Sequence, residues 1–422
     1  MSITNIIQSK DVYNIIRKAL EIMDVRIMRH GEVTAYFLYK MLQTDGIYSE
    51  QELADYTMIG MMHDIGMIKT GYSKRIVDRE TKGVWAHSVY GYLFFRYLSP
   101  IGDKAEIVLY HHLPFRLHGM IKSQYMKIAE YLTLADKMDM YLCTDGDGLN
   151  RNYFSQNAGV EFSAKAVESF NKAQAKYNIM EKLNDGSYKD EMDALLANAH
   201  FTEKYKKGFL EMLIYTIDFR SQQTVMHTLA TTAFALELGR ILRVSTKELQ
   251  LLYYGALLHD IGKIAIPVEI LEAPRRLTDE EMQVMKAHVS VSEKILRGII
   301  DDEVLEVAVR HHEKLDGSGY HRGLKGEELT QLQRIVAVAD ILSALYGKRS
   351  YKDSFEPEKI KSILIKDAEA GKICPRIVAV AVGNFDTIIR NYEKQRKNTL
   401  GIYETILTQY DKIYEQFKIY EQ

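Results

Sequence analysis

Residues 248–264, ELQLLYYGALLHDIGKI, decide the fold class of this chain. Their apolar side chains recur at intervals of three and four residues, which is the period of an α-helix with one buried face. Residues 11–42, DVYNIIRKALEIMDVRIMRHGEVTAYFLYKML, have the same period, and the chain contains no long alternating run that would indicate a strand. The sequence therefore predicts an all-α protein.

The stretch ends in a His-Asp pair that belongs to a pattern occurring twice along the chain. Ten of the 13 histidines fall into two series of the same order, and each series ends in an Ala-Asp pair inside an apolar segment. The first series is His30, His63-Asp64, His87, His111-His112 and Asp136. The second series is His227, His259-Asp260, His288, His311-His312 and Asp340.

The spacing of the two series indicates a duplicated domain. The first histidine precedes the His-Asp pair by 33 residues in one series and by 32 in the other, and the lone histidine precedes the His-His pair by 24 and 23. A period near 200 residues is too long for a solenoid repeat. We expect an N-terminal domain at residues 1–190, a second domain at residues 200–385 and a helical tail at residues 386–422, whose aromatic stripe predicts a packing or self-association surface rather than a ligand site.

Composition narrows the classes of function. A chain of 422 residues has room for two or three domains, and 46% apolar residues with only six prolines are typical of a helical globular protein. The net charge of −2 gives no reason to expect duplex nucleic acid as a partner. Two distant cysteines, Cys143 and Cys374, favour a reducing, cytoplasmic setting. The N-terminus lacks the features of a signal peptide and no run of 18 apolar residues occurs, so we expect no membrane association.

The residue types of each series are those of a metal site. Neutral imidazole and carboxylate are ligands that divalent transition metals prefer, and five His with two Asp exceed the needs of one ion. We therefore expect two divalent ions per site, bridged by Asp64 or Asp260, because one carboxylate holds two cations about 4 Å apart. Fe or Mn is expected first, and Zn, Ni or Co also suit such ligands. Two metal ions held in this way lower the pKa of a water molecule bound to them, and so supply a hydroxide that attacks phosphorus.

The pattern resembles the HD-domain superfamily of metal-dependent phosphohydrolases, and residues 205–385 resemble its HD-GYP subclass. Three blocks carry the second resemblance: LLHDIGKIAIP at residues 257–267, HHEKLDGSGY at residues 311–320 and VADILSAL at residues 338–345. Gly319 and Tyr320 match the GYP loop, whose proline is replaced by His321. The resemblance is more specific for the second domain than for the first, which matches only the wider superfamily.

The resemblance implies roles for individual residues of the second domain. One ion would be held by His227, His259, Asp260 and Asp340, and the other by Asp260, His288, His311 and His312. Lys263, together with Asp260, is implied to act in catalysis, since a cation near the scissile phosphate stabilises developing charge or protonates the leaving oxygen. Gly319 and Tyr320 would face the substrate, and Arg349 and Lys352 would hold its phosphates.

The first series keeps every ligand type but loses the other residues. Met67 stands where the second domain has Lys263, HHLPFRLHGMIKSQ at residues 111–124 replaces the GYP loop, and Asp145 stands in place of Arg349. We expect this domain to be weak or inactive in catalysis, with a regulatory or dimer-forming role. Its expected metal ligands are His30, His63, Asp64, His87, His111, His112 and Asp136.

The function implied by the resemblance is a phosphodiesterase that opens a cyclic dinucleotide to a linear one. Cyclic di-GMP is the first expectation for its substrate. The alternative is 3′,3′-cyclic GMP-AMP, because tandem proteins of this kind without receiver or membrane domains resemble enzymes that act on it. A general nucleotidase is a third hypothesis. A regulatory protein that binds a cyclic dinucleotide without hydrolysing it is a fourth, against which the retention of Lys263 argues. We also expect a homodimer through helical surfaces.

Overall fold

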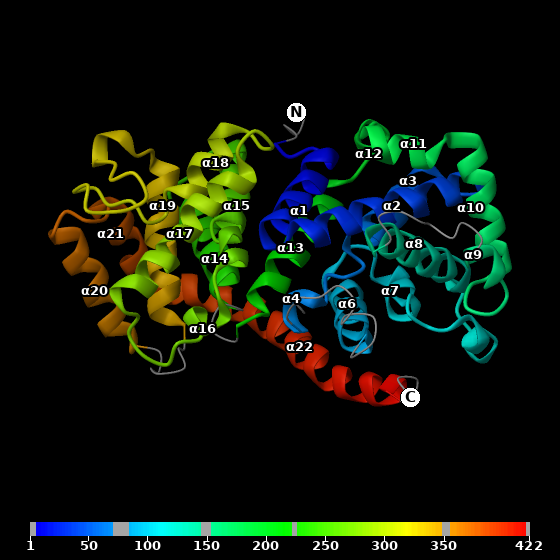
Figure 1. Ribbon diagram of the computed structural model, residues 1–422. Coiled ribbons are helices and arrows are strands. Elements are labelled where there is room, and N and C mark those ends of the chain that lie inside the picture. The colour runs from blue at the N-terminus through cyan, green and yellow to red at the C-terminus, as the bar shows by residue number, and fades with distance from the viewer. Residues whose placement is uncertain (1–5, 71–83, 145–152, 222–225, 348–354, 419–422) are drawn as a thin grey trace. The chain divides into compact units, whose positions relative to one another are not determined.

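Helices form the secondary structure of this chain in the computed structural model, which describes residues 6–70, 84–144, 153–221, 226–347 and 355–418 (Figure 1). Within these ranges the β pairing is limited to two isolated bridges, Ala158 with Phe162 and Asp316 with Lys325. The predicted all-α class is confirmed. No helix in the same ranges is both long enough and apolar enough to span a bilayer.

The chain divides into two compact units. The N-terminal unit comprises Gln8–Met212 and the segment that begins at Glu404, and the C-terminal unit consists mainly of Leu213–Tyr403. Each unit contains one complete His/Asp series. The domain boundaries expected near residues 190, 200 and 385 stay predictions.

The helices that precede the second series share the N-terminal unit. They are α1 (Ser9–Met23), α2 (Val25–Asp45), α3 (Glu50–Met62), α4 (Met67–Thr70), α6 (Val84–Leu98), η1 (Gly102–Lys104), α7 (Glu106–Tyr110), η2 (Phe115–Met120), α8 (Met126–Thr144), α9 (Tyr153–Gln156), α10 (Ala164–Tyr177), α11 (Ile179–Asp185) and α12 (Tyr188–Asn198). Helix α13 (Glu203–Asp218) begins in this unit and ends in the other.

The helices that carry the second series lie in the C-terminal unit. They are α14 (His227–Ile241), α15 (Thr246–Leu258), η3 (Ile261–Ala265), α16 (Val268–Leu271), α17 (Asp279–Leu296), α18 (Asp302–Val309), η4 (Gly326–Glu328), α19 (Gln331–Tyr346), α20 (Pro357–Glu369) and α21 (Pro375–Gly383). The last helix, α22 (Phe385–Phe417), begins in this unit and ends in the N-terminal unit.

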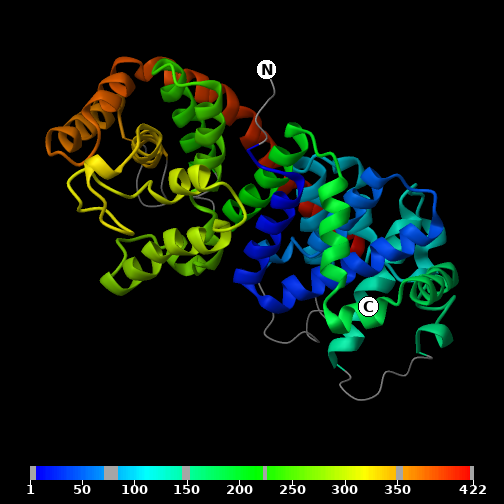
Figure 2. The same ribbon diagram turned by 90° about the horizontal axis from the view of Figure 1, so that it is seen from above.

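Corresponding helices pack alike in the two units. Helix α2 lies against α3 and α8, and in the same way α14 lies against α15 and α19. Helix α7 contacts both α6 and α8, as α18 contacts both α17 and α19. The bundle of α14, α15, α17, α18 and α19 can be followed in Figures 1 and 2. This packing gathers the segments that carry each His/Asp series.

The helix that leads to each His-Asp pair begins with the same cap. The hydroxyl of Ser49 caps α3 and that of Ser245 caps α15, and in both a glutamate three residues later accepts a hydrogen bond from the backbone N–H of the cap. Such a capping box fixes where a helix starts. The residue that follows each helix, 14 positions after the cap, is the histidine of the pair, His63 or His259.

A glycine two residues after each His-Asp pair brings that pair against the helix of the lone histidine. A Cβ atom on Gly66 would lie 2.0 Å from the carbonyl oxygen of His87, and one on Gly262 would lie 2.0 Å from that of His288. Only glycine allows so close an approach of two backbones. In each domain the His-Asp pair and the helix of the lone histidine are therefore held together by backbone packing.

Helix α22 stacks aromatic side chains on rings of each unit. In the C-terminal unit Tyr403 stacks on Phe219 with ring centroids 5.0 Å apart, and in the N-terminal unit Tyr410 stacks on Tyr90 at 4.0 Å. The aromatic stripe of the tail thus packs against the rest of the chain. Self-association of the chain stays a prediction.

Candidate metal centres

The seven residues of the second series lie together in the C-terminal unit. His227 begins α14, and His259 and Asp260 follow α15. His288 lies in α17, His311 and His312 follow α18, and Asp340 lies in α19. Within this group two sets of three residues have ligand atoms close enough to share an ion: His227, His259 and Asp260, and His288, His311 and His312.

Asp260 lies between two pairs of histidines. Its Oδ2 is 3.3 Å from Nε2 of His227 and 3.1 Å from Nε2 of His259. Its Oδ1 is 3.2 Å from Nε2 of His288 and 3.9 Å from Nε2 of His311. Each carboxylate oxygen therefore faces one histidine pair, which is the arrangement that a carboxylate bridging two cations requires.

Asp340 closes the other side of the cluster. Its Oδ1 lies 3.0 Å from Nε2 of His227, and its Oδ2 lies 3.5 Å from Nδ1 of His312. Asp340 and Asp260 are both buried. Buried carboxylates need a partner charge, and a divalent cation supplies it at the point where these oxygens and nitrogens converge.

Hydrogen bonds behind the rings orient the histidines for metal binding. In His259, His288 and His311, Nδ1 lies 2.7 Å from the carbonyl oxygen three residues earlier. Because a carbonyl oxygen only accepts, Nδ1 carries the proton and Nε2 presents its lone pair to the cluster. The Nε2 atoms of His288 and His311 face each other at 3.3 Å, and two lone pairs at that distance repel unless a cation lies between them. The residues fit divalent ions.

The protonation of the rings differs across the cluster. Burial lowers the pKa of His312 to about 3, lowers the pKa of His288 and holds the pKa of His311 well below its usual value, so these rings are neutral at neutral pH. Burial alone would also lower the pKa of His227, but its hydrogen bonds to two aspartates raise it to about 9. A metal ion would have to displace that proton.

Lys263 lies beside the cluster. Its Nζ donates a hydrogen bond to Oδ2 of Asp260, and only 15% of its side chain is exposed. Burial lowers the pKa of Lys263, but Asp260, Asp218 and Asp340 outweigh that effect and hold the pKa above its usual value. Arg220 fixes the turn that carries Lys263 by donating hydrogen bonds to three of its carbonyl oxygens. A protonated lysine is thus held at the bridging carboxylate.

A cavity of about 910 Å³ opens from this cluster. Such a volume lies in the range of roughly 300–1,000 Å³ that small-molecule sites occupy. Besides cluster residues, the wall contains four cations and three tyrosines: Lys263, Arg275, Arg276, Arg396, Tyr320, Tyr346 and Tyr392. Cations and aromatic rings suit a ligand that carries phosphates and bases.

The loop that resembles GYP lies against the His-His pair. The ring of Tyr320 lies on that of His312, with centroids 4.6 Å apart. The buried carboxylate of Glu313 accepts hydrogen bonds from two backbone N–H groups of the loop. Gly319 packs so tightly that a Cβ atom there would lie 2.4 Å from a backbone nitrogen of the same loop. The loop therefore presents Tyr320 to the cavity and keeps it beside the cluster.

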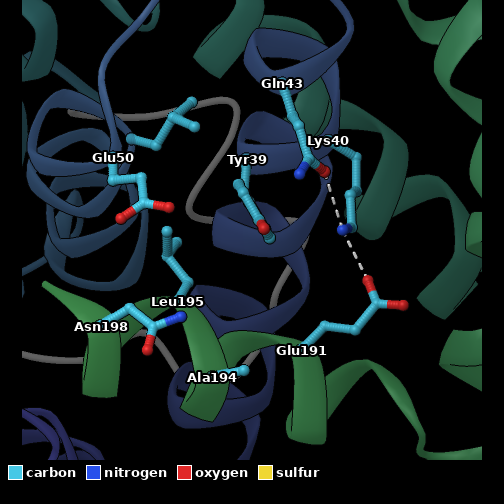
Figure 3. A pocket seen from close by; sticks show the side chains of 9 residues that line it. Tyr39, Lys40, Gln43, Glu50, Glu191, Ala194, Leu195 and Asn198 are labelled. Atoms are coloured by element: carbon cyan, nitrogen blue, oxygen red, sulfur yellow. Dashed lines mark hydrogen bonds and ion pairs between the residues drawn. The ribbon is translucent and has the colours of Figure 1, made fainter.

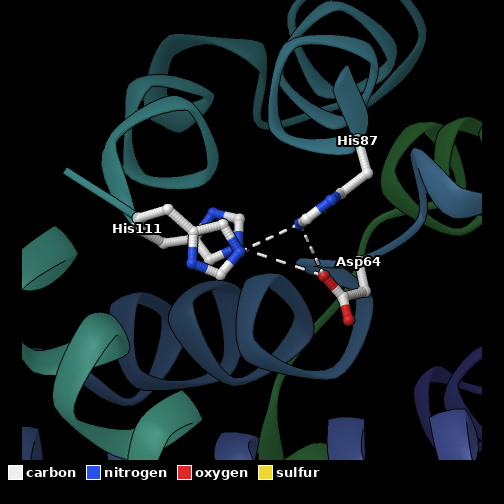
Figure 4. Close-up of side chains that lie close together, drawn as sticks. Asp64, His87 and His111 are labelled. Carbon is white, nitrogen blue, oxygen red and sulfur yellow. Dashed lines mark hydrogen bonds and ion pairs between the residues drawn. The ribbon is translucent and has the colours of Figure 1, made fainter. Parts of the chain in front are cut away.

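The first series forms a similar cluster in the N-terminal unit. Oδ1 of Asp64 lies 3.2 Å from Nε2 of His87 and 3.9 Å from Nε2 of His111, and Figure 4 shows these rings directed at the carboxylate. Oδ1 of Asp136 lies 3.0 Å from Nε2 of His30. The ligand sets are His30, His63 and Asp136, and Asp64, His87, His111 and His112.

This cluster also fits divalent ions. The Nδ1 atoms of His63 and His111 lie 2.7 and 2.6 Å from carbonyl oxygens three residues earlier, so the Nε2 atoms present lone pairs. Both Nε2 atoms are buried and have no hydrogen-bond partner among the described residues. The Nε2 atoms of His87 and His112 face each other at 3.0 Å. Clusters consistent with metal sites thus occur in both units.

Four further positions were singled out from the sequence because they differ between the two domains or were expected to contact the substrate. Met67, at the position of Lys263, has a buried apolar side chain. Asp145, Arg349 and Lys352 lie outside the described residues.

A smaller cavity of about 210 Å³ in the N-terminal unit is lined by none of the cluster residues (Figure 3). The buried Lys40 in its wall pairs with Glu191 at 2.6 Å and lies over the rings of Tyr39 and Tyr177. The charge of this lysine is therefore compensated within the protein.

Comparison with known proteins identifies the domains. Residues 9–141 match the model of an HD family, and residues 211–377 match a second HD-domain model. The chain contains two HD domains in tandem. It is 26% identical over 400 residues, or 90% of either chain, to the 3′3′-cGAMP-specific phosphodiesterase 1 of Vibrio cholerae serotype O1.

One further relative is similar in sequence to part of the chain, and one solved structure has a similar fold. The cyclic di-GMP phosphodiesterase response regulator RpfG of Xanthomonas campestris is 34% identical over 201 residues, which are 43% of this chain and 53% of that protein. A crystal structure of a cyclic GMP-AMP specific phosphodiesterase of V. cholerae has the same fold, with a TM-score of 0.56 and 19% identity over 90% of this chain and 98% of that one. The homology with HD-GYP phosphodiesterases expected from the sequence is confirmed.

Sequence reasoning did not single out three arginines in the cavity of the second HD domain. Arg275 and Arg276 precede α17, and Arg396 lies on α22. The adjacent Arg275-Arg276 pair between two helices was a visible signal. Arg396 had none, because its helix was expected to form a packing or self-association surface rather than a ligand site. The tail nevertheless contributes residues to the cavity wall.

Proposed function

We propose that the second HD domain is a metal-dependent phosphodiesterase that hydrolyses a cyclic dinucleotide to a linear one, with 3′,3′-cyclic GMP-AMP preferred over cyclic di-GMP. The observation that carries the proposal is the position of Asp260. One carboxylate faces two histidine pairs, accepts a hydrogen bond from Lys263 and lines a cavity of about 910 Å³. Metal ligands, a cation and room for a substrate thus meet at one group.

The ligands proposed for two ions are those of the second series. His227, His259, Asp260 and Asp340 would hold one ion, and Asp260, His288, His311 and His312 the other. When bound, two such ions polarise a phosphate oxygen and lower the pKa of a water molecule. Fe or Mn is proposed first, since His/Asp sites accept these ions readily, and Zn, Ni or Co also fit the ligand set.

Protein side chains supply the remaining functions. Lys263 is held protonated and only 15% of its side chain is exposed, so it can stabilise charge that develops on the phosphate or give a proton to the leaving oxygen. Tyr320 offers a ring face on which a base can stack. The GYP-like loop fixes this ring through Glu313, so it is positioned before substrate enters.

Phosphate groups would be held by the cations of the cavity wall. Arg275, Arg276 and Arg396 line the cavity, and guanidinium groups bind phosphate oxygens in pairs. Arg275 and Arg396 form ion pairs with Glu281 and Glu393, which a phosphate would have to displace. Arg349 and Lys352 stay proposed as further phosphate contacts from the sequence resemblance.

The preference for 3′,3′-cyclic GMP-AMP rests on the extent of the similarity. The Vibrio relative specific for that nucleotide aligns with 90% of this chain and so includes both HD domains. RpfG aligns with only 43%. A relative that shares the whole architecture is the better guide to substrate, and it favours the alternative over cyclic di-GMP, the first expectation from sequence.

A substrate panel tests the proposal. The full chain, purified without oxygen and loaded with Mn²⁺ or Fe²⁺, is given 3′,3′-cyclic GMP-AMP, cyclic di-GMP and cyclic di-AMP at equal concentration, and linear products are separated by chromatography. We expect the highest kcat/KM for cyclic GMP-AMP. Equal or higher kcat/KM for cyclic di-GMP would overturn the preference alone. Saturable binding without hydrolysis of any of the three nucleotides would overturn the proposed enzymatic function and favour a regulatory binding protein.

A further inference from the structure

The two HD domains differ behind the first histidine of each cluster. In the second domain, Oγ of Ser343 lies 2.8 Å from Nδ1 of His227. In the first domain the corresponding position, three residues after the final aspartate, is Asp139, and its Oδ2 lies 2.8 Å from Nδ1 of His30. The same place thus holds a neutral hydroxyl in one cluster and a buried carboxylate in the other.

The two partners act differently on the metal-facing nitrogen. A carboxylate only accepts, so Nδ1 of His30 donates to Asp139, and the negative charge behind the ring makes Nε2 a stronger electron donor. Ser343 already donates its hydroxyl proton to the carbonyl oxygen of Asp340 at 2.9 Å, so it accepts from His227 as a neutral oxygen. Against the effect of burial, nearby aspartates raise the pKa of His30 as well as that of His227, so a metal ion displaces a proton from both rings. Once deprotonated at Nε2, His30 is the better metal ligand of the two.

A second difference acts at the bridging aspartate. Lys263 occupies Oδ2 of Asp260 and competes there with a cation. In the first domain the corresponding residue is Met67, which has no charge. Lys137 of α8 also places a positive charge near Asp64, without a described hydrogen bond to it. Among the described contacts, a lysine hydrogen-bonded to the bridging carboxylate thus occurs in the second domain.

The clusters also differ in access. Of the side chains that face solvent most, His227 is 16% and His312 is 26% exposed in the second domain. Their counterparts in the first domain, His30 and His112, are 10% and 7% exposed. A more deeply buried site exchanges its ions more slowly, because water or a chelator must reach the ion before it can leave.

We propose that the first HD domain is the tighter metal site of this chain, and that Asp139 is the positioning residue responsible. The first domain keeps its ions at free-metal concentrations at which the second releases them. The occupancy of the second domain then follows metal supply, while the first stays loaded. This inference goes beyond the proposed phosphodiesterase and holds whether or not the chain hydrolyses a nucleotide.

Metal release from the full chain tests it. Protein loaded with Mn²⁺ is equilibrated against a graded series of chelator concentrations, and the ions retained per chain are counted by elemental analysis. We expect two steps. Asp139→Ser should weaken the tighter step by about 10- to 100-fold, the usual effect of losing a partner behind a ligating histidine, and leave the weaker step in place. Ser343→Asp should tighten the weaker step alone.

Matched controls separate metal affinity from folding. Asp193→Ser removes an exposed carboxylate from α12 in the same unit as Asp139 and should move neither step. Helical content and thermal unfolding of the metal-free variants by circular dichroism report folding. Should Asp139→Ser fail to fold, Ser343→Asp decides. The inference is overturned if Asp139→Ser moves the weaker step or neither step, or if Ser343→Asp leaves the weaker step unchanged.

Discussion

Replacing Lys263 by methionine converts one position of the second HD domain to the residue of the first, Met67. Lys263 is a largely buried cation that contacts the bridging carboxylate of Asp260, so solvent screens its charge only weakly. Positioned acid–base or charge-stabilising groups contribute about 10²- to 10⁴-fold to rate. We therefore expect kcat to fall by that factor, equivalent to about 3–5 kcal/mol of activation free energy.

The assay for Lys263→Met is hydrolysis of 3′,3′-cyclic GMP-AMP at saturating Mn²⁺, with metal content measured on the same sample. Retained metal shows that the loss is in catalysis, because removal of the competing cation should if anything strengthen metal binding at Asp260. Met67→Lys, made in the first domain, is the matched control and should leave kcat unchanged. A kcat for Lys263→Met within twofold of the unchanged protein, at full metal occupancy, would refute the reasoning.

Three further predictions concern the fold, the metal and the substrate. Gly262→Ala should lower the free energy of unfolding, measured in urea, by about 3 kcal/mol or more, because the added Cβ would strike the carbonyl oxygen of His288. The control Gly383→Ala, at a position with open space, should lower it little. Equal stabilities of the two variants would contradict this. The metal dissociation constant of the second HD domain should fall about tenfold per pH unit from 7 to 9 and then level off, since His227, with a pKa of about 9, must lose its proton; a flat profile in chelator competition would contradict it. Tyr320→Ala should raise KM by roughly 5- to 100-fold through lost stacking while Tyr320→Phe stays within twofold, and a KM unchanged by Tyr320→Ala would remove the base-stacking role.

Much of the site could be predicted because its ligands lie at the ends of helices or within them, at positions that the local sequence marks. Capping residues Ser49 and Ser245, His-Asp pairs at helix ends and the glycines that follow them are local features, and each has a sequence pattern. Since both copies repeat these features, the clusters of His and Asp could be expected before their geometry was known.

Other features depend on packing between distant segments and left no pattern to read. Arg396 reaches the cavity because Tyr392 of α22 packs against Phe234 of α14 and Tyr346 of α19, and nothing in the tail sequence specifies those contacts. The contrast between Asp139 and Ser343 was visible as a residue three positions after each final aspartate. Its meaning appears only when Nδ1 of His30 and of His227 are seen to bond there.

The most direct measurement compares hydrolysis after each cluster is disabled in the full chain. His259→Ala combined with Asp260→Ala removes the ligands at the centre of the second HD domain, and His63→Ala combined with Asp64→Ala makes the same change in the first. With folding checked by circular dichroism, we predict that the second-domain variant loses hydrolysis of 3′,3′-cyclic GMP-AMP and that the first-domain variant retains it. Hydrolysis that survives loss of His259 and Asp260, and disappears with loss of His63 and Asp64, would contradict the assignment of catalysis to the second HD domain.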